Sequence, residues 1–225
     1  MSFHIAPLAP QIAPALAEQL AQVETATLGH FLHHGFLDPA IGPVLADARI
    51  AGTALTVRIP GPDSTLLHQA LGMARPGDVL VIDRCGDTRH ACWGGVTTLA
   101  ARLAGIAAVV IDGPATDFSE IRRAGLPVWC RGASALTTKF LSLESAVNVP
   151  VSVGGVAICP GDAILADESG VVAITPGRVA AIARQGLKLQ EAELQVLARL
   201  HAGERLADIS GAAARIAAAP PLDVG

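Results

Sequence analysis

The feature that most constrains the fold is an alternation of short apolar segments with amphipathic ones between residues 79 and 130. Apolar segments of strand length, separated by segments of helical length, occur in the order 79–82, 94–104, 107–111, 117–124 and 126–130. The apolar segments are hydrophobic at nearly every position, which is typical of parallel strands covered on both faces. This strand–helix–strand order predicts a parallel sheet in an α/β fold.

The residues before this unit predict helices and one further strand. Residues 11–34 have apolar residues at helical spacing, interrupted near 25–27, which predicts two helices. Residues 49–59 alternate and predict a strand that Pro60 ends, and 64–73 predict a short helix.

The residues after the unit change from alternating elements to a β-rich pattern. From residue 149 onward, strand-length segments are separated by Gly-Gly, Pro-Gly-Asp and Glu-Ser-Gly turns, which predicts antiparallel hairpins. A long helix is predicted from Pro176 to about His201, with Pro in its first turn. The tail, 216–225, is expected to be loose or packed on a partner.

Composition limits the classes of protein to which the chain can belong. With 51% hydrophobic residues in 225, we expect one large domain with a sizeable core. The net charge of −4 argues against a nucleic-acid partner, and no apolar run reaches the length of a membrane span. The N-terminus does not resemble a signal peptide, and the four cysteines lack a CxxC or zinc spacing. We therefore expect a cytoplasmic protein whose cysteines are small core residues.

Two loops are candidates for a ligand site, because ligands of parallel sheets bind where the strands end and helices begin. Gly94 and Gly95 open one predicted helix, and Asp117 opens the next. The glycine pair could bring backbone amides close to an anion, or it could be a packing turn. Asp117 could hold a hard cation such as Mg²⁺, or it could simply cap its helix.

At these loops the sequence resembles a known family. The blocks AGTALTV, PGDVLVID, VVIDGPATD, GLPVWCRG, NVPVSVGGVAICPGD and ADESGVVAI occur in the order typical of the RraA-like family. That family includes 4-hydroxy-4-methyl-2-oxoglutarate aldolases and regulators of ribonuclease E. The resemblance covers about residues 23–185.

The resemblance implies an α/β fold with a β/β/α swivelling-domain (phosphohistidine-domain-like) core and flanking N- and C-terminal helices. It implies one domain over 1–225, with its core at 23–185 and a C-terminal helical extension at 176–225. It further implies a homotrimer, often doubled to a hexamer, with active sites between subunits.

The resemblance also assigns roles to residues at the two loops. In the aldolases the position of Asp117 binds a divalent metal, here Mg²⁺ or Mn²⁺. The backbone amides of Gly94, Gly95, Val96 and Thr97 match the loop that holds the substrate's carboxylate. The chain departs from the aldolases at two positions, because the family's arginine is Thr116 and the commonly acidic residue at position 95 is a glycine.

Replacing that arginine by threonine removes enough transition-state stabilisation to alter function. A threonine hydroxyl can donate a hydrogen bond to a developing enolate oxygen but carries no charge, and one aimed donor contributes about 2.7–4 kcal/mol. Arg84 and Arg89, which follow the 79–82 strand, could supply the charge instead, or could pair with Asp83 and Asp87. Arg131 is a weaker candidate, since it could lie at either rim of the sheet.

Other titratable residues are weaker candidates. His30, His33 and His34 lie in one predicted helix without a third metal ligand nearby, and His90 precedes the glycine pair and could serve in acid–base chemistry. Glu191 and Glu193 lie on the C-terminal helix, which in the aldolases brings an acidic residue to a neighbour's site. Lys139 and Lys188 lie away from the strand ends, which argues against a Schiff-base mechanism.

Two functions follow as hypotheses. The first is a metal-dependent lyase acting on a 2-oxo acid, by retro-aldol cleavage, by oxaloacetate-type decarboxylation, or both, since both reactions generate pyruvate enolate. Its substrate would differ from the family's because of Thr116. The second is a non-catalytic regulator or binding protein. We favour the first, because the regulators tend to keep the arginine and lose the aspartate, whereas this chain has lost the arginine and kept Asp117.

Overall fold

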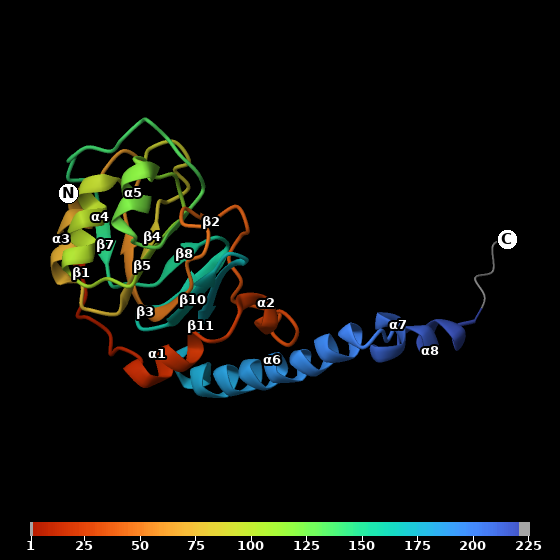
Figure 1. Ribbon diagram of the computed structural model, residues 1–225. Helices are drawn as coiled ribbons and strands as arrows, with labels where there is room; N and C mark the ends of the chain where they lie inside the picture. Colours follow the sequence, from red (N-terminus) through yellow and green to blue (C-terminus); the bar gives the residue numbers. More distant parts are fainter. Residues whose placement is uncertain (1, 221–225) are drawn as a thin grey trace.

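The computed structural model describes residues 2–220, which form a central mixed sheet with helices around it (Figure 1). The main run of strands is β1 (Phe3–Ile5), β7 (Ser145–Val147), β3 (Ile50–Arg58), β4 (Asp78–Asp83), β5 (Ala108–Ile111), β6 (Val128–Cys130) and β2 (Gly42–Pro43). Strands β3 to β6 are parallel to one another. The predicted parallel sheet, including its strand order from 79 to 130, is therefore confirmed.

The β-rich second part of the chain contributes two hairpins. Strands β10 (Ala163–Asp167) and β11 (Gly170–Ile174) form one antiparallel pair, and β10 joins the main sheet by pairing with the first half of β3. Strands β8 (Val151–Val153) and β9 (Val156–Ile158) form a separate hairpin. Both hairpins confirm the antiparallel pattern expected after residue 149.

Three hydrophobic clusters hold these layers together. Helices α3 (Thr65–Met73), α4 (Gly95–Leu103) and α5 (Phe118–Ala124) cover one face of β3 to β6. The β8–β9 hairpin covers the other face, over a cluster that includes the wholly buried Trp129. The third cluster lies between the β10–β11 hairpin and the terminal helices. The molecule thus has the α/β class expected, with a central sheet and flanking helices.

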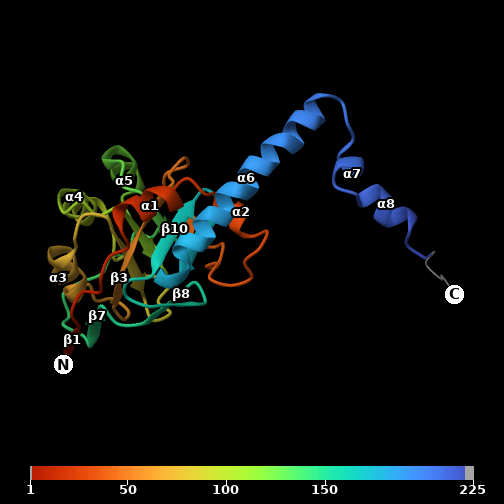
Figure 2. The ribbon, with the colours of Figure 1, turned by 90° about the horizontal axis from the view of Figure 1, so that it is seen from below.

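The terminal helices differ in how much of them is packed. Helices α1 (Pro14–Leu20) and α2 (Thr25–Leu28) pack on the first half of α6 (Val179–His201), which follows a short 3₁₀ turn at Pro176–Arg178. The second half of α6, together with α7 (Leu206–Ile209) and α8 (Ala212–Ala217), projects away from the body (Figures 1 and 2). The predicted helix at 176–201 is confirmed. Part of the tail expected to be loose is helical in α8, and its last residues, 221–225, lie outside the described residues.

The prediction for the cysteines is correct for only two of them. Cys92 and Cys130 are buried, and burial raises the pKa of the Cys92 thiol to about 11. Cys85 and Cys159 are exposed, contrary to expectation, because both lie in turns between elements. Among residues 2–220, no helix is long and apolar enough to cross a membrane.

Candidate functional site

The two loops identified in the sequence meet at one edge of the sheet. The loop after β4 leads into α4, and the loop after β5 leads into α5, as expected where neighbouring parallel strands end. A backbone hydrogen bond of 2.8 Å from the Thr116 amide to the Trp93 carbonyl joins the two loops. This bond places the start of α4 beside Thr116 and Asp117.

The Asp117 carboxylate faces α4 instead of its own helix. Asp117 occupies the position before α5, but its side chain makes no capping hydrogen bond there. Its Oδ2 accepts a 3.0 Å hydrogen bond from the Gly95 amide, and its Oδ1 accepts one of 3.2 Å from the Thr116 hydroxyl. The backbone of Asp117 is left-handed, with φ of 54°, a conformation that Asp and Asn tolerate better than most residues. Asp117 therefore occupies the N-cap position of α5 but does not cap the helix with its side chain.

Gly94 is required by this close approach. A β-carbon at position 94 would lie 2.6 Å from Asp117 Oδ2 and 2.9 Å from Thr116 Cγ2. The backbone at Gly94 is extended, so its conformation would suit any residue. The absence of a side chain is what lets the Asp117 carboxylate reach the start of α4.

The four amides expected to bind a carboxylate are not equally available. The Gly94 amide donates to the Thr97 hydroxyl at 2.9 Å, and the Gly95 amide is used by Asp117. The amides of Val96 and Thr97 have no acceptor among the described residues. The free amides at a helix start attract anions, because the helix dipole is positive there. Of the four amides predicted to bind a carboxylate, two are therefore already used within the protein.

Glu120 is a candidate site residue that the sequence analysis missed. It lies in the first turn of α5, and a β-carbon at Gly95 would collide with its Oε2. The Glu120 carboxylate thus fills the space beside position 95, where the resemblance implies that an acidic side chain is common. The sequence did offer a signal for Glu120. It lies three residues after Asp117, and residues at this spacing lie on the same side of a helix.

The carboxylates present fit a divalent cation that keeps much of its water. Among residues 2–220, no group of three His, Cys, Asp or Glu side chains could form a closed metal cage. Asp117 and Glu120 are both exposed and offer hard oxygen ligands next to the start of α4. Mg²⁺ is commonly held by one or two carboxylates with several waters, so two carboxylates suffice for such a site.

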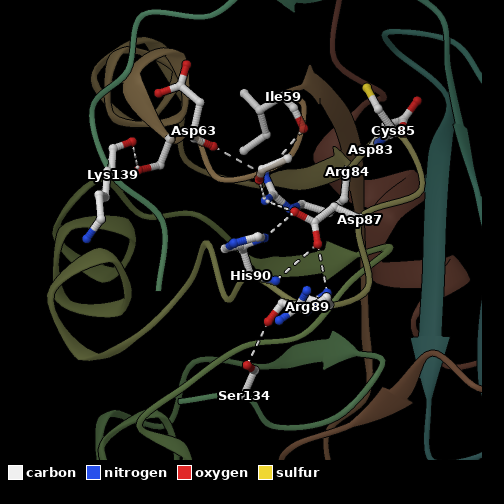
Figure 3. Close-up of polar contacts among 12 residues, drawn as sticks. Ile59, Asp63, Asp83, Arg84, Cys85, Asp87, Arg89, His90, Ser134 and Lys139 are labelled. Atoms are coloured by element: carbon white, nitrogen blue, oxygen red, sulfur yellow. Dashed lines mark hydrogen bonds and ion pairs between the residues drawn. The ribbon is translucent and has the colours of Figure 1, made fainter. Parts of the chain in front are cut away.

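The structure excludes Arg84 as the substitute for the missing arginine. Arg84 is wholly buried, and its guanidinium donates to the backbone carbonyls of Ile59, Gly61 and Asp63 (Figure 3). Its nearest carboxylate is Asp87, at 3.7 Å, and its Nε has no hydrogen-bond partner. A guanidinium held in this way braces the 59–63 turn and cannot reach a ligand. The expectation failed because the strand end directs this side chain inward.

Arg89 is exposed and remains available. Its backbone amide donates to Asp87, and its carbonyl accepts a hydrogen bond from Ser134 at 2.7 Å. Its guanidinium makes no hydrogen bond or ion pair with residues 2–220. The neighbouring Ser134 amide donates to the carbonyl of Ala115, next to Thr116. Arg84 and Arg89 lie in the same loop, which contacts the candidate site. Of the two, only Arg89 has a guanidinium that is exposed and unpaired among residues 2–220.

His90 is fixed by Asp87 in the same loop (Figure 3). The His90 Nδ1 lies 2.7 Å from Asp87 Oδ2. Burial would raise the pKa of Asp87, but hydrogen bonds from the Arg89 and His90 amides and from the His90 ring lower it. Asp87 therefore stays charged and orients the ring.

The other candidate residues either form ion pairs away from the candidate site or have no partner ligands near them within residues 2–220. Arg131 pairs with Asp112 at 2.5 Å and with Asp38 at 2.8 Å, so its charge is already neutralised. His30, His33 and His34 are exposed and belong to no metal cluster within the described residues.

Comparisons with known proteins agree with this architecture. A family model described as "RraA-like: Aldolase/RraA" matches residues 17–173. A protein of Halalkalibacterium halodurans, provisionally named a 4-hydroxy-4-methyl-2-oxoglutarate aldolase, is 34% identical over 154 residues, which are 68% of this chain and 73% of that protein. The 4-hydroxy-4-methyl-2-oxoglutarate aldolase of Thermus thermophilus is 35% identical over 127 residues, 56% of this chain and 75% of the other. The crystal structure of Streptomyces coelicolor RraAS2, described as an unusual member of the RNase ES inhibitor RraA family, superposes with a TM-score of 0.74 at 27% identity, covering 84% of this chain and 98% of that one.

Proposed function

The chain belongs to the RraA-like family, and on that premise we propose that it is a lyase that releases pyruvate from a 2-oxo acid. The reaction would be retro-aldol cleavage, decarboxylation of an oxaloacetate-type acid, or both. The observation that carries the proposal is the meeting of free helix amides with two carboxylates at the start of α4. A 2-oxo acid has a carboxylate and a carbonyl on adjacent carbons, so it needs an anion site and a cation site side by side.

In this reaction, different groups at the candidate site bind the substrate carboxylate, hold the metal and orient its ligand. The amides of Val96 and Thr97 bind the substrate carboxylate. A Mg²⁺ or Mn²⁺ ion held by Asp117 and Glu120 would act as a Lewis acid toward the 2-oxo oxygen. The Thr116 hydroxyl and the Gly95 amide orient the Asp117 carboxylate by donating one hydrogen bond to each oxygen.

The substitution at position 116 supports a substrate different from the family's. The Thr116 hydroxyl donates its hydrogen bond to Asp117, so it is not available to stabilise an enolate oxygen directly. The lost donor corresponds to about 2.7–4 kcal/mol of transition-state stabilisation. The Arg89 guanidinium is the available cation that could replace part of it, acting on a substrate long enough to reach the 84–93 loop.

A second candidate function is that of a non-catalytic regulator or binding protein. The observation in its favour is that no cation is fixed beside Asp117 among the described residues, since Arg84 is buried and Arg131 is neutralised. In addition, the similar solved structure of RraAS2 is described as a member of the RNase ES inhibitor RraA family. In this case the site would bind a metal or an acid without turnover.

The exposed apolar faces support the proposal that the chain forms a homotrimer or hexamer. Val96, Leu99 and Leu103 on α4 are 81%, 60% and 82% exposed, and they follow one another at helical spacing beside the site. Leu194 and Leu197 are exposed on the projecting part of α6. Apolar patches of this kind usually mark interfaces. A neighbouring subunit covering α4 would also enclose the site.

A pyruvate-release assay tests the proposal. Purified protein is incubated with a panel of 2-oxo acids in Mg²⁺ or Mn²⁺, with and without chelator. We expect pyruvate from at least one substrate, and loss of that activity with chelator. Metal binding without turnover of any substrate would favour the regulator.

A further inference from the structure

The N-terminal strand β1 leaves one edge of the main sheet open. It pairs in parallel with β7, has no strand on its other side among residues 2–220, and lies beside α3 (Figures 1 and 2). The Ala6 amide donates to the Val147 carbonyl at 3.1 Å, and alternate residues of a strand in a parallel ladder bond to the same neighbour. His4 therefore bonds toward β7, and the N–H and C=O groups of Phe3 and Ile5 face away from it. Such an open edge is a template for a further strand.

An apolar groove runs along the same edge. The Phe3 and Ile5 side chains are 46% and 45% exposed and lie on the α3 side of the sheet, since side chains two positions apart share a face. Together with residues of α3 they enclose a groove of about 480 Å³, and the α3 residues are Thr65, Leu66, His68 and Gln69. The lining contains no aspartate, glutamate, lysine or arginine among the described residues. The groove is therefore suited to an uncharged, apolar strand and not to a charged peptide.

The apolar surface continues beyond the groove. The His68 ring meets the ring of Phe140 edge to face, with 4.7 Å between the ring centroids. Phe140 is itself 66% exposed. Contiguous exposed apolar surface of this kind usually marks an interface, and here it lies directly beside unpaired backbone groups. The edge thus offers a partner strand both hydrogen bonds and apolar contacts.

We propose that β1 of a second copy of the chain occupies this edge, paired antiparallel about a two-fold axis at His4. In that register Phe3 of each copy lies opposite Ile5 of the other, so the outward N–H and C=O groups of the two strands pair with one another. Centring the pairing on Ile5 would place Phe3 opposite Pro7, which has no N–H, and centring it on Phe3 would place Ile5 opposite residue 1, outside the strand. The two-fold register is self-complementary, because it brings the uncharged side chains of both strands to the same face, over the two grooves.

Disulfide cross-linking of the full chain tests the register. In the proposed pairing the two copies of residue 4 face each other, with Cα atoms about 4.5 Å apart, whereas the two copies of residue 2 are offset along the strands by roughly 13 Å. A disulfide requires Cα atoms within about 7 Å. Under mild oxidation, His4→Cys should therefore form a covalent dimer on non-reducing gels, and Ser2→Cys, the matched control at another exposed position, should not.

The wild-type protein is the second control, because its exposed Cys85 and Cys159 could also cross-link. Equal cross-linking of Ser2→Cys and His4→Cys would overturn the proposed register. Cross-linking of His4→Cys no greater than that of the wild type would overturn the pairing of two copies and would favour a strand of another protein at this edge.

A proline variant tests the hydrogen bonds of the edge. Ile5→Pro removes an N–H that faces outward and leaves the ladder between β1 and β7 intact, since proline is tolerated on an edge strand in this orientation. By light scattering, its molar mass should be half that of the wild type, whether or not the copies also associate through α4. Ile5→Val keeps the N–H and an apolar side chain and should retain the wild-type mass. An unchanged mass in Ile5→Pro would overturn the proposal. If Ile5→Pro does not fold, the cross-linking comparison decides.

Discussion

The carboxylate of Glu120 occupies the space beside Gly95 that a side chain at position 95 would fill. Gly95 opens α4, and Glu120 lies in the first turn of α5, so two helices share one position of the site. An acidic group that the resemblance implies at position 95 is thus supplied from the neighbouring helix. The glycine is required for this exchange, since even a methyl group there would displace the carboxylate.

This relationship predicts that Glu120 and position 95 are interchangeable as a source of the carboxylate. Glu120→Gln should reduce Mn²⁺ affinity, and Gly95→Asp combined with Glu120→Ala should restore part of it, because a carboxylate returns to the same place. Calorimetric titration with Mn²⁺ measures both. Glu144→Gln, at an exposed glutamate outside the site, is the control. Equal affinity in wild type and Glu120→Gln would contradict a role for Glu120.

Asp117→Asn should abolish or greatly weaken Mn²⁺ binding with little effect on the melting temperature. Asparagine tolerates the left-handed backbone and keeps an acceptor for the Gly95 amide, but it loses the charge that holds a cation. Calorimetry and thermal unfolding separate the two effects. A lower melting temperature with unchanged Mn²⁺ affinity would show that the carboxylate only joins α4 to α5.

Thr116→Arg should raise pyruvate release from 2-oxo acids by a factor on the order of 10²–10³, the size of one oxyanion donor. The added guanidinium would stand beside Asp117, where Thr116 now donates its hydroxyl. If Arg89 already supplies the charge, the added arginine should instead lower an existing activity, and Arg89→Gln should lower it too. Steady-state rates of the variants distinguish these outcomes. No activity in any of them, with metal bound, would favour the regulator.

Arg84→Ala should destabilise the fold by about 3–5 kcal/mol, because it empties a buried site and leaves the backbone carbonyls around 59–63 without their donor. Arg89→Gln, at an exposed arginine in the same loop, should change the free energy of unfolding little. Denaturant unfolding measures both. Similar, small effects of the two substitutions would refute the structural role of Arg84.

The chain should form a homotrimer or a hexamer at micromolar concentration, measured by light scattering. Leu99→Glu, on the exposed apolar face of α4, should dissociate the assembly by placing a charge in the interface, with little effect on the fold of the monomer. The matched control is Arg102→Glu, which introduces the same residue at an already charged position of α4. A monomeric wild-type protein would refute the prediction.

The sequence by itself determined the order of the elements. The parallel unit from Val79 to Cys130, the hairpins after residue 149 and the helix ending at His201 all follow from periodicity and turn residues, which act over a few positions. It also predicted that the two loops of the candidate site meet, because the carboxyl ends of neighbouring parallel strands must lie together.

Only the tertiary structure decided which side chains those loops present. Arg84 and Arg89 follow the same strand, yet one is wholly buried against the 59–63 turn and the other is exposed. Glu120 reaches Gly95, and Asp117 faces α4 instead of its own helix, through contacts between separate elements. Local patterns cannot specify such contacts, because they depend on how distant segments pack and on which buried groups find hydrogen-bond partners.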